Sequence, residues 1–216
     1  MHFVLGTPSG CIRPVVSKGH MKLVILDRDG TINVDSTDYI KSPEEWQPLP
    51  GALEAIARLT HAGWHVVVAT NQSGLGRGLF DVATLNAMHA KLHTMLAAVG
   101  GRVDAIFYCP HAPDEGCRCR KPEPGLFEQI GERYGMEFKG VPAVGDSVRD
   151  LVACVAAGCE PHLVLTGKAE GLRGRPLPEG FPPNTVVHLD LTAFADFLTR
   201  REAPEVQARR PDTLMP

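Results

Sequence analysis

Short apolar runs alternate with amphipathic stretches along most of this chain. The apolar runs are too short for helices, and we expect buried strands at 22–26, 64–69, 105–109, 141–145, 162–165 and 186–189. The intervening stretches have helical spacing, and we expect helices at 51–61, 81–99, 124–134, 147–157 and 191–200. Strands that are apolar on both faces and separated by helices are typical of βαβ units. The pattern therefore predicts an α/β fold, a Rossmann-like parallel sheet with helices on both faces.

The two ends of the chain lack this alternation. Residues 1–20 mix Gly, Pro and Ser without periodicity, and we expect either a disordered arm or a non-native extension before a domain that begins at Met21. Residues 201–216 carry charges and prolines with little apolar content, which predicts a loose tail. The Gly- and Pro-rich stretch 167–184 is predicted to be a surface loop. One domain over residues 21–200 is therefore expected.

Polar residues outside this periodicity follow the predicted strands directly. Asp27 and Asp29 come after the first strand, Thr70 and Asn71 after the second, and Asp146 after the fourth. In an open parallel sheet, ligands bind outside the carboxyl ends of the strands. These separate segments are therefore expected to converge on one edge of the sheet.

The carboxylates of Asp27 and Asp29 are two residues apart on an extended segment, so both can face one small site. Like charges this close need a cation or a shared proton, and Mg²⁺ prefers oxygen ligands. A pair of solvated loop aspartates is the alternative for such a motif by itself. The rest of the chain disfavours that alternative, because hydroxyl, amide, lysine and carboxylate groups follow at other strand ends, in the segments 70–74, 120–122 and 145–150.

Together these segments resemble the four motifs of the haloacid dehalogenase (HAD) superfamily of phosphotransferases. The resemblance implies that Asp27 is a nucleophile that carries an aspartyl-phosphate and that Asp29 is the general acid and base. It implies that Thr70 and Lys121 hold the phosphoryl oxygens. It also implies that Mg²⁺ binds the carboxylates of Asp27 and Asp146 and the backbone carbonyl of Asp29. Asp150 is expected to support the site without binding the ion.

Three cysteines and a histidine lie in one short segment after the third predicted strand: Cys109, His111, Cys117 and Cys119. Three thiolates and one imidazole are the ligands of a closed tetrahedral zinc site, so we expect a structural Zn²⁺ in the loop 109–119. A loop disulfide or free thiols are the alternatives. A rigid zinc loop ending beside Arg120 and Lys121 would fix both cations at the edge of the sheet.

The zinc loop followed by Cys-Arg-Lys-Pro is similar to the D-glycero-D-manno-heptose-1,7-bisphosphate 7-phosphatases, which act in the supply of ADP-heptose for lipopolysaccharide synthesis. The histidinol-phosphate phosphatases share nearly the same features. Arg120 favours a substrate with a second phosphate, because a second cation repels the amine of histidinol phosphate; an arginine bonded to the zinc loop is the alternative. The resemblance implies that the remaining substrate contacts are Asp35, Ser36, Thr37, Asp38, Asn71, Gln72, Ser73 and Ser147.

Composition and charge disfavour nucleic acid and membranes as partners. The formal charge of -3 and the pI near 6.3 give no basic footprint for nucleic acid, and no apolar run approaches the ~20 residues of a membrane helix. We therefore expect a cytoplasmic, monomeric enzyme for a small sugar bisphosphate, with no large cap domain over its site. The rival hypotheses are an inactive zinc-stabilised binding domain, and a phosphotransferase or nucleic-acid end phosphatase.

Overall fold

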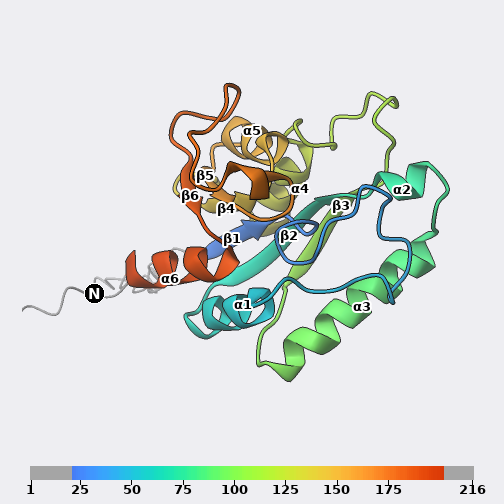
Figure 1. The fold of residues 1–216 in the computed structure, drawn as a ribbon, viewed down its shortest axis with the longest axis horizontal. Coiled ribbons are helices and arrows are strands. Elements are labelled where there is room, and N and C mark those ends of the chain that lie inside the picture. The colour runs from blue at the N-terminus through green and yellow to red at the C-terminus, as the bar shows by residue number, and fades with distance from the viewer. Residues whose placement is uncertain (1–20, 202–216) are drawn as a thin grey trace, which may run out of the picture.

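The computed structural model describes residues 21–201, so the expectations for 1–20 and for the C-terminal tail lie outside the described residues. A six-stranded parallel sheet in the order β3-β2-β1-β4-β5-β6 forms the centre (Figure 1). Its strands are β1 Leu23–Leu26, β2 His65–Asn71, β3 Ala105–Cys109, β4 Pro142–Gly145, β5 Glu160–Val164 and β6 Val186–His188. The helices are α1 Ala52–His61, α2 Ser73–Gly76, α3 Val82–Ala98, α4 Gly125–Tyr134, α5 Val148–Ala156, α6 Leu191–Arg201 and the 3-10 helix η1 Gly167–Leu172.

The strand order changes direction at β1, which is where parallel sheets bind ligands. β1 pairs with β2 on one side and with β4 on the other, and Leu26 lies opposite both Val68 and Val144. The next residue, Asp27, donates its backbone N–H to the Val144 carbonyl at 2.8 Å. The carboxyl ends of the three central strands therefore meet around Asp27.

Apolar side chains of β1 alternate between two cores, one on each face of the sheet. Val24 and Leu26 pack with α1, α3 and α6, whereas Leu23 and Ile25 pack with α4 and α5. Figure 1 shows the same division, with α1 and α3 on one side of the strands and α4 and α5 on the other. Because helices cover both faces of the central sheet, β1 is apolar and buried along its whole length, and the predicted α/β class is confirmed.

The structure differs from the predicted elements in several places, and β5, for example, begins at Glu160, two residues before the predicted strand. β2 continues to Asn71, because its last residue still pairs with Cys109 of β3. The short helix α2 directly follows it and has too few residues for a periodic signal. The predicted loop 167–184 begins with η1, whose Ala169 is buried against Leu165.

The intervals between the site segments contain ordinary elements. The chain between Asp29 and Thr70 holds a loop, α1 and most of β2, and that between Asn71 and Lys121 holds α2, α3 and β3. In residues 21–201, neither interval contains a folded cap domain. None of the helices in this range has the length and apolar character needed to span a membrane.

Candidate active site

Lys121 joins two carboxylates below the surface of the candidate site. Its ammonium donates to Asp27 Oδ1 at 2.7 Å and to the Ala69 carbonyl at 2.8 Å, and it lies 2.6 Å from Asp150 Oδ1. Both Lys121 and Asp27 are nearly inaccessible, at 3% and 5% exposure. Burial lowers the lysine pKa, but the charges of Asp150 and Asp27 outweigh it and raise that pKa above its usual value. Lys121 is therefore a fixed cation beside Asp27.

Asp146 completes a cluster of three carboxylates, defined here as Asp27, Asp146 and Asp150. Their oxygens lie within 4.8 Å of one another. Asp146 Oδ2 accepts from the backbone N–H of Lys168 at 2.7 Å, whereas the buried Oδ1 has no hydrogen-bond partner in the described part of the chain. A Cβ at Gly30, where φ is +81°, would collide with the Asp146 carboxylate, so the approach is open only to glycine.

The charges of this cluster are not balanced by Lys121 alone. Burial raises the pKa of Asp27 to about 6, although the lysine lowers it. Burial and the charges of Asp27 and Asp150 raise the pKa of Asp146 to about 8. Clustered carboxylates with an unpartnered oxygen are the donor set of a hard divalent cation. The residues therefore fit Mg²⁺ bound by Asp27 and Asp146.

Asp29 is held by donors from three directions. Arg28 Nη2 donates to its Oδ1 at 2.9 Å, Asn33 Nδ2 to the same oxygen at 2.9 Å, and Gln72 Nε2 to its Oδ2 at 2.9 Å. Burial alone raises the pKa of Asp29, but Arg28 and these hydrogen bonds bring it below its usual value. In this arrangement Asp29 is a carboxylate that can accept a proton only after giving up some of these bonds.

Residues at the end of β2 bind both Gln72 and the backbone of Lys121. Thr70 Oγ1 accepts from Gln72 Nε2 at 3.0 Å. Asn71 Nδ2 donates to the Lys121 carbonyl at 3.0 Å, and the Lys121 N–H donates to Asn71 Oδ1 at 3.1 Å. Asn71 was predicted as a substrate contact, and its amide is engaged in holding the Lys121 backbone.

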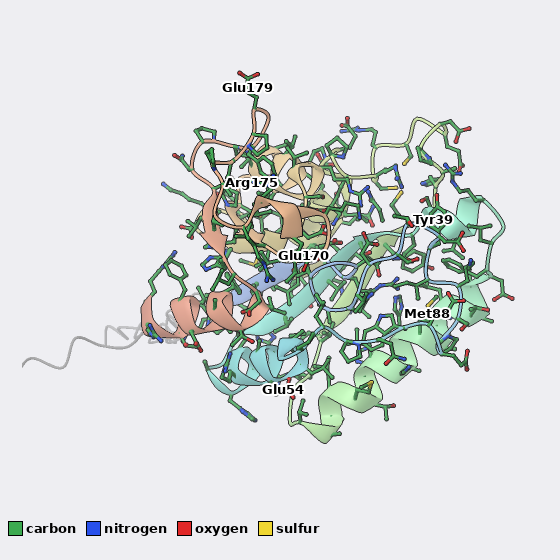
Figure 2. All side chains as sticks on the ribbon, in the orientation of Figure 1. Tyr39, Glu54, Met88, Glu170, Arg175 and Glu179 are labelled. Carbon is green, nitrogen blue, oxygen red and sulfur yellow. The ribbon has the colours of Figure 1, made fainter. Side chains whose placement is uncertain are left out.

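A cavity of about 280 Å³ opens beside Asp29. Of the predicted site residues it is lined by Asp29, Asp35, Ser36, Thr37, Asn71, Gln72, Ser73 and Arg120. Its other lining residues are Arg28, Tyr39, Ile40, Gly74, Phe80, Arg149 and Lys168. Tyr39 is on the loop from β1 to α1 (Figure 2), and the Arg77 guanidinium at the end of α2 lies 5.7 Å from its ring centre.

Two predicted substrate contacts do not line this cavity. The Asp38 side chain is 87% exposed and pairs with Lys41 at 2.6 Å, because it points outward from its turn. Ser147 is buried and donates its hydroxyl to Asp150. Asp38 therefore lies on the outer surface of the loop and the Ser147 hydroxyl binds a carboxylate, and a substrate contact at either position stays a prediction.

The cysteine–histidine cluster is formed by Cys109, His111, Cys117 and Cys119, whose ligand atoms also lie within 4.8 Å of one another. Cys109 Sγ is 3.6 Å from Cys117 Sγ, and His111 Nδ1 is 3.2 Å from Cys119 Sγ. Disulfide sulfurs are about 2.05 Å apart, and these cysteines are free thiols. The donor set fits a tetrahedral zinc ion. Arg120 Nη1 donates to the His111 carbonyl at 3.4 Å, so this arginine is tied to the loop and also faces the cavity.

Four polar residues of the site were missed in the sequence. Arg28 and Asn33 hold Asp29, and Arg149 and Lys168 line the cavity. Lys168 follows the end of β5, so the rule that places ligands at the carboxyl ends of strands would have found it there. Arg28 lies between Asp27 and Asp29, and the motif by itself does not predict that its side chain turns back to bind one of them.

Comparisons with known proteins agree on the kind of protein that this chain resembles. A HAD-hydrolase-like family model matches residues 118–190, and a polynucleotide kinase 3 phosphatase model matches residues 22–148. The D-glycero-beta-D-manno-heptose-1,7-bisphosphate 7-phosphatase of Bordetella bronchiseptica is 60% identical over 82% of this chain and 98% of its own length. The enzyme of that name from Pseudomonas aeruginosa is 56% identical over 82% of this chain and 97% of its own length.

Solved structures give the same picture. The crystal structure of D,D-heptose 1,7-bisphosphate phosphatase from B. bronchiseptica, complexed with magnesium and phosphate, has a TM-score of 0.80 and 58% identity. The match covers 84% of this chain and 99% of that one. The corresponding phosphatase from Burkholderia thailandensis has a TM-score of 0.64 and 54% identity over 82% of this chain and 98% of that one.

Proposed function

The chain belongs to the D-glycero-beta-D-manno-heptose-1,7-bisphosphate 7-phosphatase family of HAD-type phosphatases, and on that premise we propose that it removes the 7-phosphate of D-glycero-D-manno-heptose 1,7-bisphosphate. The family membership confirms the resemblance found in the motifs. The observation that carries the proposal is the buried Asp27 carboxylate, held at 2.7 Å by Lys121 beside Asp146. The product would enter ADP-heptose synthesis for the lipopolysaccharide core.

Asp27 begins the reaction. One of its carboxylate oxygens attacks the phosphorus, the bond from phosphorus to the sugar O7 breaks, and an aspartyl-phosphate forms. In this proposal Lys121 and Thr70, both nearly inaccessible, neutralise and bind the phosphoryl oxygens. The positive charge of Lys121 is present before substrate arrives, so the site needs little rearrangement to stabilise the transferring group.

Asp29 acts as the general acid and then as the general base. In its present contacts it is a carboxylate, so substrate binding must loosen some of its bonds to Arg28, Asn33 and Gln72 before it carries the proton that the leaving O7 takes. The resulting carboxylate then takes a proton from water, which attacks the phosphorus and breaks its bond to Asp27. Inorganic phosphate leaves, and Asp29 is protonated again.

We assign the Mg²⁺ ligands to the carboxylates of Asp27 and Asp146 and the backbone carbonyl of Asp29. Magnesium, when bound, supplies positive charge against the phosphoryl oxygens. The unpartnered Oδ1 of Asp146 supports this assignment. Asp150 is given a supporting part, because Lys121 and Ser147 already contact its two oxygens.

A structural Zn²⁺ is assigned to Cys109, His111, Cys117 and Cys119. Four protein ligands fill a tetrahedral site, which leaves no position for substrate. The loop ends at Cys119, two residues before Lys121, and its His111 carbonyl binds Arg120. The zinc would therefore act on catalysis only by fixing these two cations.

Histidinol phosphate is the second candidate substrate. In the wall of the cavity that would receive it, Arg28 and Lys168 are paired with Asp29 and Asp35, and the further cations Arg120 and Arg149 disfavour an amine. An inactive binding domain is disfavoured, since Asp27, Asp29, Lys121 and Asp146 are all present. The expected monomeric state and cytoplasmic location stay predictions; light scattering after size-exclusion chromatography tests the former.

Phosphate release in the presence of Mg²⁺ tests the function. The panel contains both anomers of the heptose 1,7-bisphosphate, histidinol phosphate, fructose 1,6-bisphosphate and a 3′-phosphorylated oligonucleotide, with Asp27→Asn as the inactive control. We expect the highest kcat/KM for a heptose bisphosphate. A clear preference for histidinol phosphate or the oligonucleotide would overturn the assigned substrate, and no release from any of them would overturn the phosphatase.

A further inference from the structure

The cationic side chains that line the cavity differ in whether they already have hydrogen-bond or ion-pair partners in the protein. Arg28 is bound to Asp29, Lys168 is paired with Asp35, and Arg120 donates to the His111 carbonyl. Arg149 makes no hydrogen bond and no ion pair with any side chain or carbonyl in residues 21–201, and its Nε is buried without a partner. It is the one cation of the cavity, within those residues, whose donors are unused.

The neighbours of Arg149 do not explain this. The adjacent carboxylate of Asp150 is taken by Lys121 at 2.6 Å and by the Ser147 hydroxyl. Burying a donor of a charged group without a partner is unfavourable, because the donor loses its hydrogen bonds to water. A guanidinium in a cavity wall with free donors is suited to a phosphate, which it binds through two parallel hydrogen bonds.

Arg149 is also placed by different elements from Arg120. It lies in the first turn of α5, three residues after Asp146 at the end of β4, whereas Arg120 is tied to the zinc loop. Both line the same cavity, with Asp29 also in its wall. A ligand with its reacting phosphate beside Asp29 would thus extend toward guanidinium groups that belong to two separate parts of the fold.

We propose that Arg149 is a specificity-determining residue that, together with Arg120, binds the phosphate which stays on the sugar. This inference rests on the proposed function, because it needs a substrate with two phosphates. A different use of Arg149 is to balance the charge of the carboxylate cluster from a distance. That use would act on magnesium binding and on every substrate alike, whereas a phosphate clamp acts only on the bisphosphate.

The test compares kcat/KM for heptose 1,7-bisphosphate and for heptose 7-phosphate, which lacks the second phosphate. We expect Arg149→Gln to lower the ratio of the two values about tenfold to a hundredfold, mainly through KM, as the loss of a charged hydrogen-bonded contact does. Arg149→Lys keeps the positive charge but loses the pair of parallel guanidinium donors, and it should recover part of the kcat/KM ratio. Arg133→Gln, which removes an exposed guanidinium at the far end of α4, should leave the ratio as it is.

An equal fall in kcat/KM on both substrates would overturn the inference and indicate that Arg149 balances charge. A larger fall in the kcat/KM ratio in Lys168→Gln than in Arg149→Gln would also overturn it, because Lys168 would then be the main ligand of the second phosphate. Should Arg149→Gln not fold, Arg149→Lys carries the same comparison. If the unmutated chain does not hydrolyse the heptose bisphosphate, the proposed function fails by itself. The ratio is then measured with fructose 1,6-bisphosphate and fructose 6-phosphate, which tests Arg149 separately.

Discussion

The carboxylate cluster and the cysteine–histidine cluster are assembled in opposite ways. Asp27 is far in the sequence from Asp146 and Asp150; the three come from the ends of β1 and β4 and the first turn of α5, and all are buried. The cysteine–histidine cluster comes from one short segment, the last residue of β3 and the loop after it, and of its four residues only Cys109 is buried. The sheet therefore builds the first cluster, whereas the second depends on its own loop.

This difference predicts how each cluster responds to damage. Loss of one carboxylate should leave the sheet folded, because the strands are held by two apolar cores that do not include it. Its expected effect is on catalytic activity. Loss of one thiolate should instead leave the loop without the ligand set that holds it closed. Catalytic activity should then fall, because Lys121 follows that loop directly. The predictions below test this contrast, beginning with the largest effect.

Asp27→Asn tests the sheet-built cluster. We expect phosphate release to fall by about 10⁴-fold or more, since an amide cannot form the aspartyl-phosphate. The melting temperature should not fall, because the substitution removes one of three crowded negative charges. Steady-state kinetics and thermal unfolding check both parts, with Asp114→Asn on the exposed part of the zinc loop as the control. A variant that lost activity because it unfolded would contradict the contrast.

Cys109→Ser tests the loop-built cluster. We expect loss of bound zinc, a lower melting temperature and a fall in kcat of about 10- to 100-fold, because Lys121 is no longer fixed. Magnesium affinity should change little, since no carboxylate is touched. Elemental analysis, thermal unfolding and kinetics measure these effects, and the unmutated protein stripped of zinc and reloaded serves as control. Unchanged folding and activity in verified zinc-free protein would show that the loop needs no metal.

The two clusters also differed in how far the sequence could predict them. The cysteine–histidine spacing is local, so the four proposed ligands could be named without a fold. The carboxylates required the rule about strand ends, which worked because the strands are apolar on both faces. Arg149 and Asp38 show the limit of prediction from sequence, because each lies in a loop or the first turn of a helix. Whether such a side chain points into the cavity depends on its rotamer and its neighbours, which the hydrophobic periodicity does not encode.

Magnesium binding to the carboxylate cluster should strengthen as the pH rises. Without the ion, the pKa of Asp146 is about 8 and that of Asp27 about 6, above the usual 3.8. These raised values stabilise the protonated, metal-free fold at low pH, and that stabilisation is lost as the pH rises through about 6 and then about 8. Magnesium displaces these protons, so its affinity should rise by up to about tenfold per pH unit between pH 6 and pH 8.

Thermal unfolding with and without Mg²⁺ at several pH values measures this directly. The increase in melting temperature caused by the ion should grow toward pH 8. Zinc retention, measured on the same samples, should not follow the same curve, because the carboxylates are not its ligands. A magnesium effect that is constant from pH 6 to pH 8 would contradict the protonation of Asp146.

Asn71→Ala tests the connection between the two clusters and should have the smallest effect. The substitution removes both hydrogen bonds between the Asn71 amide and the Lys121 backbone, at 3.0 and 3.1 Å, and should cost about 1–2 kcal/mol and a several-fold fall in kcat. Asn86→Ala on the exposed face of α3 is the control. If Asn71 and the zinc loop act on activity through the same lysine, the double variant with Cys109→Ser should lose less than the product of the two single losses. Losses that multiply would mean that Asn71 acts on the substrate itself and that the loop alone positions Lys121.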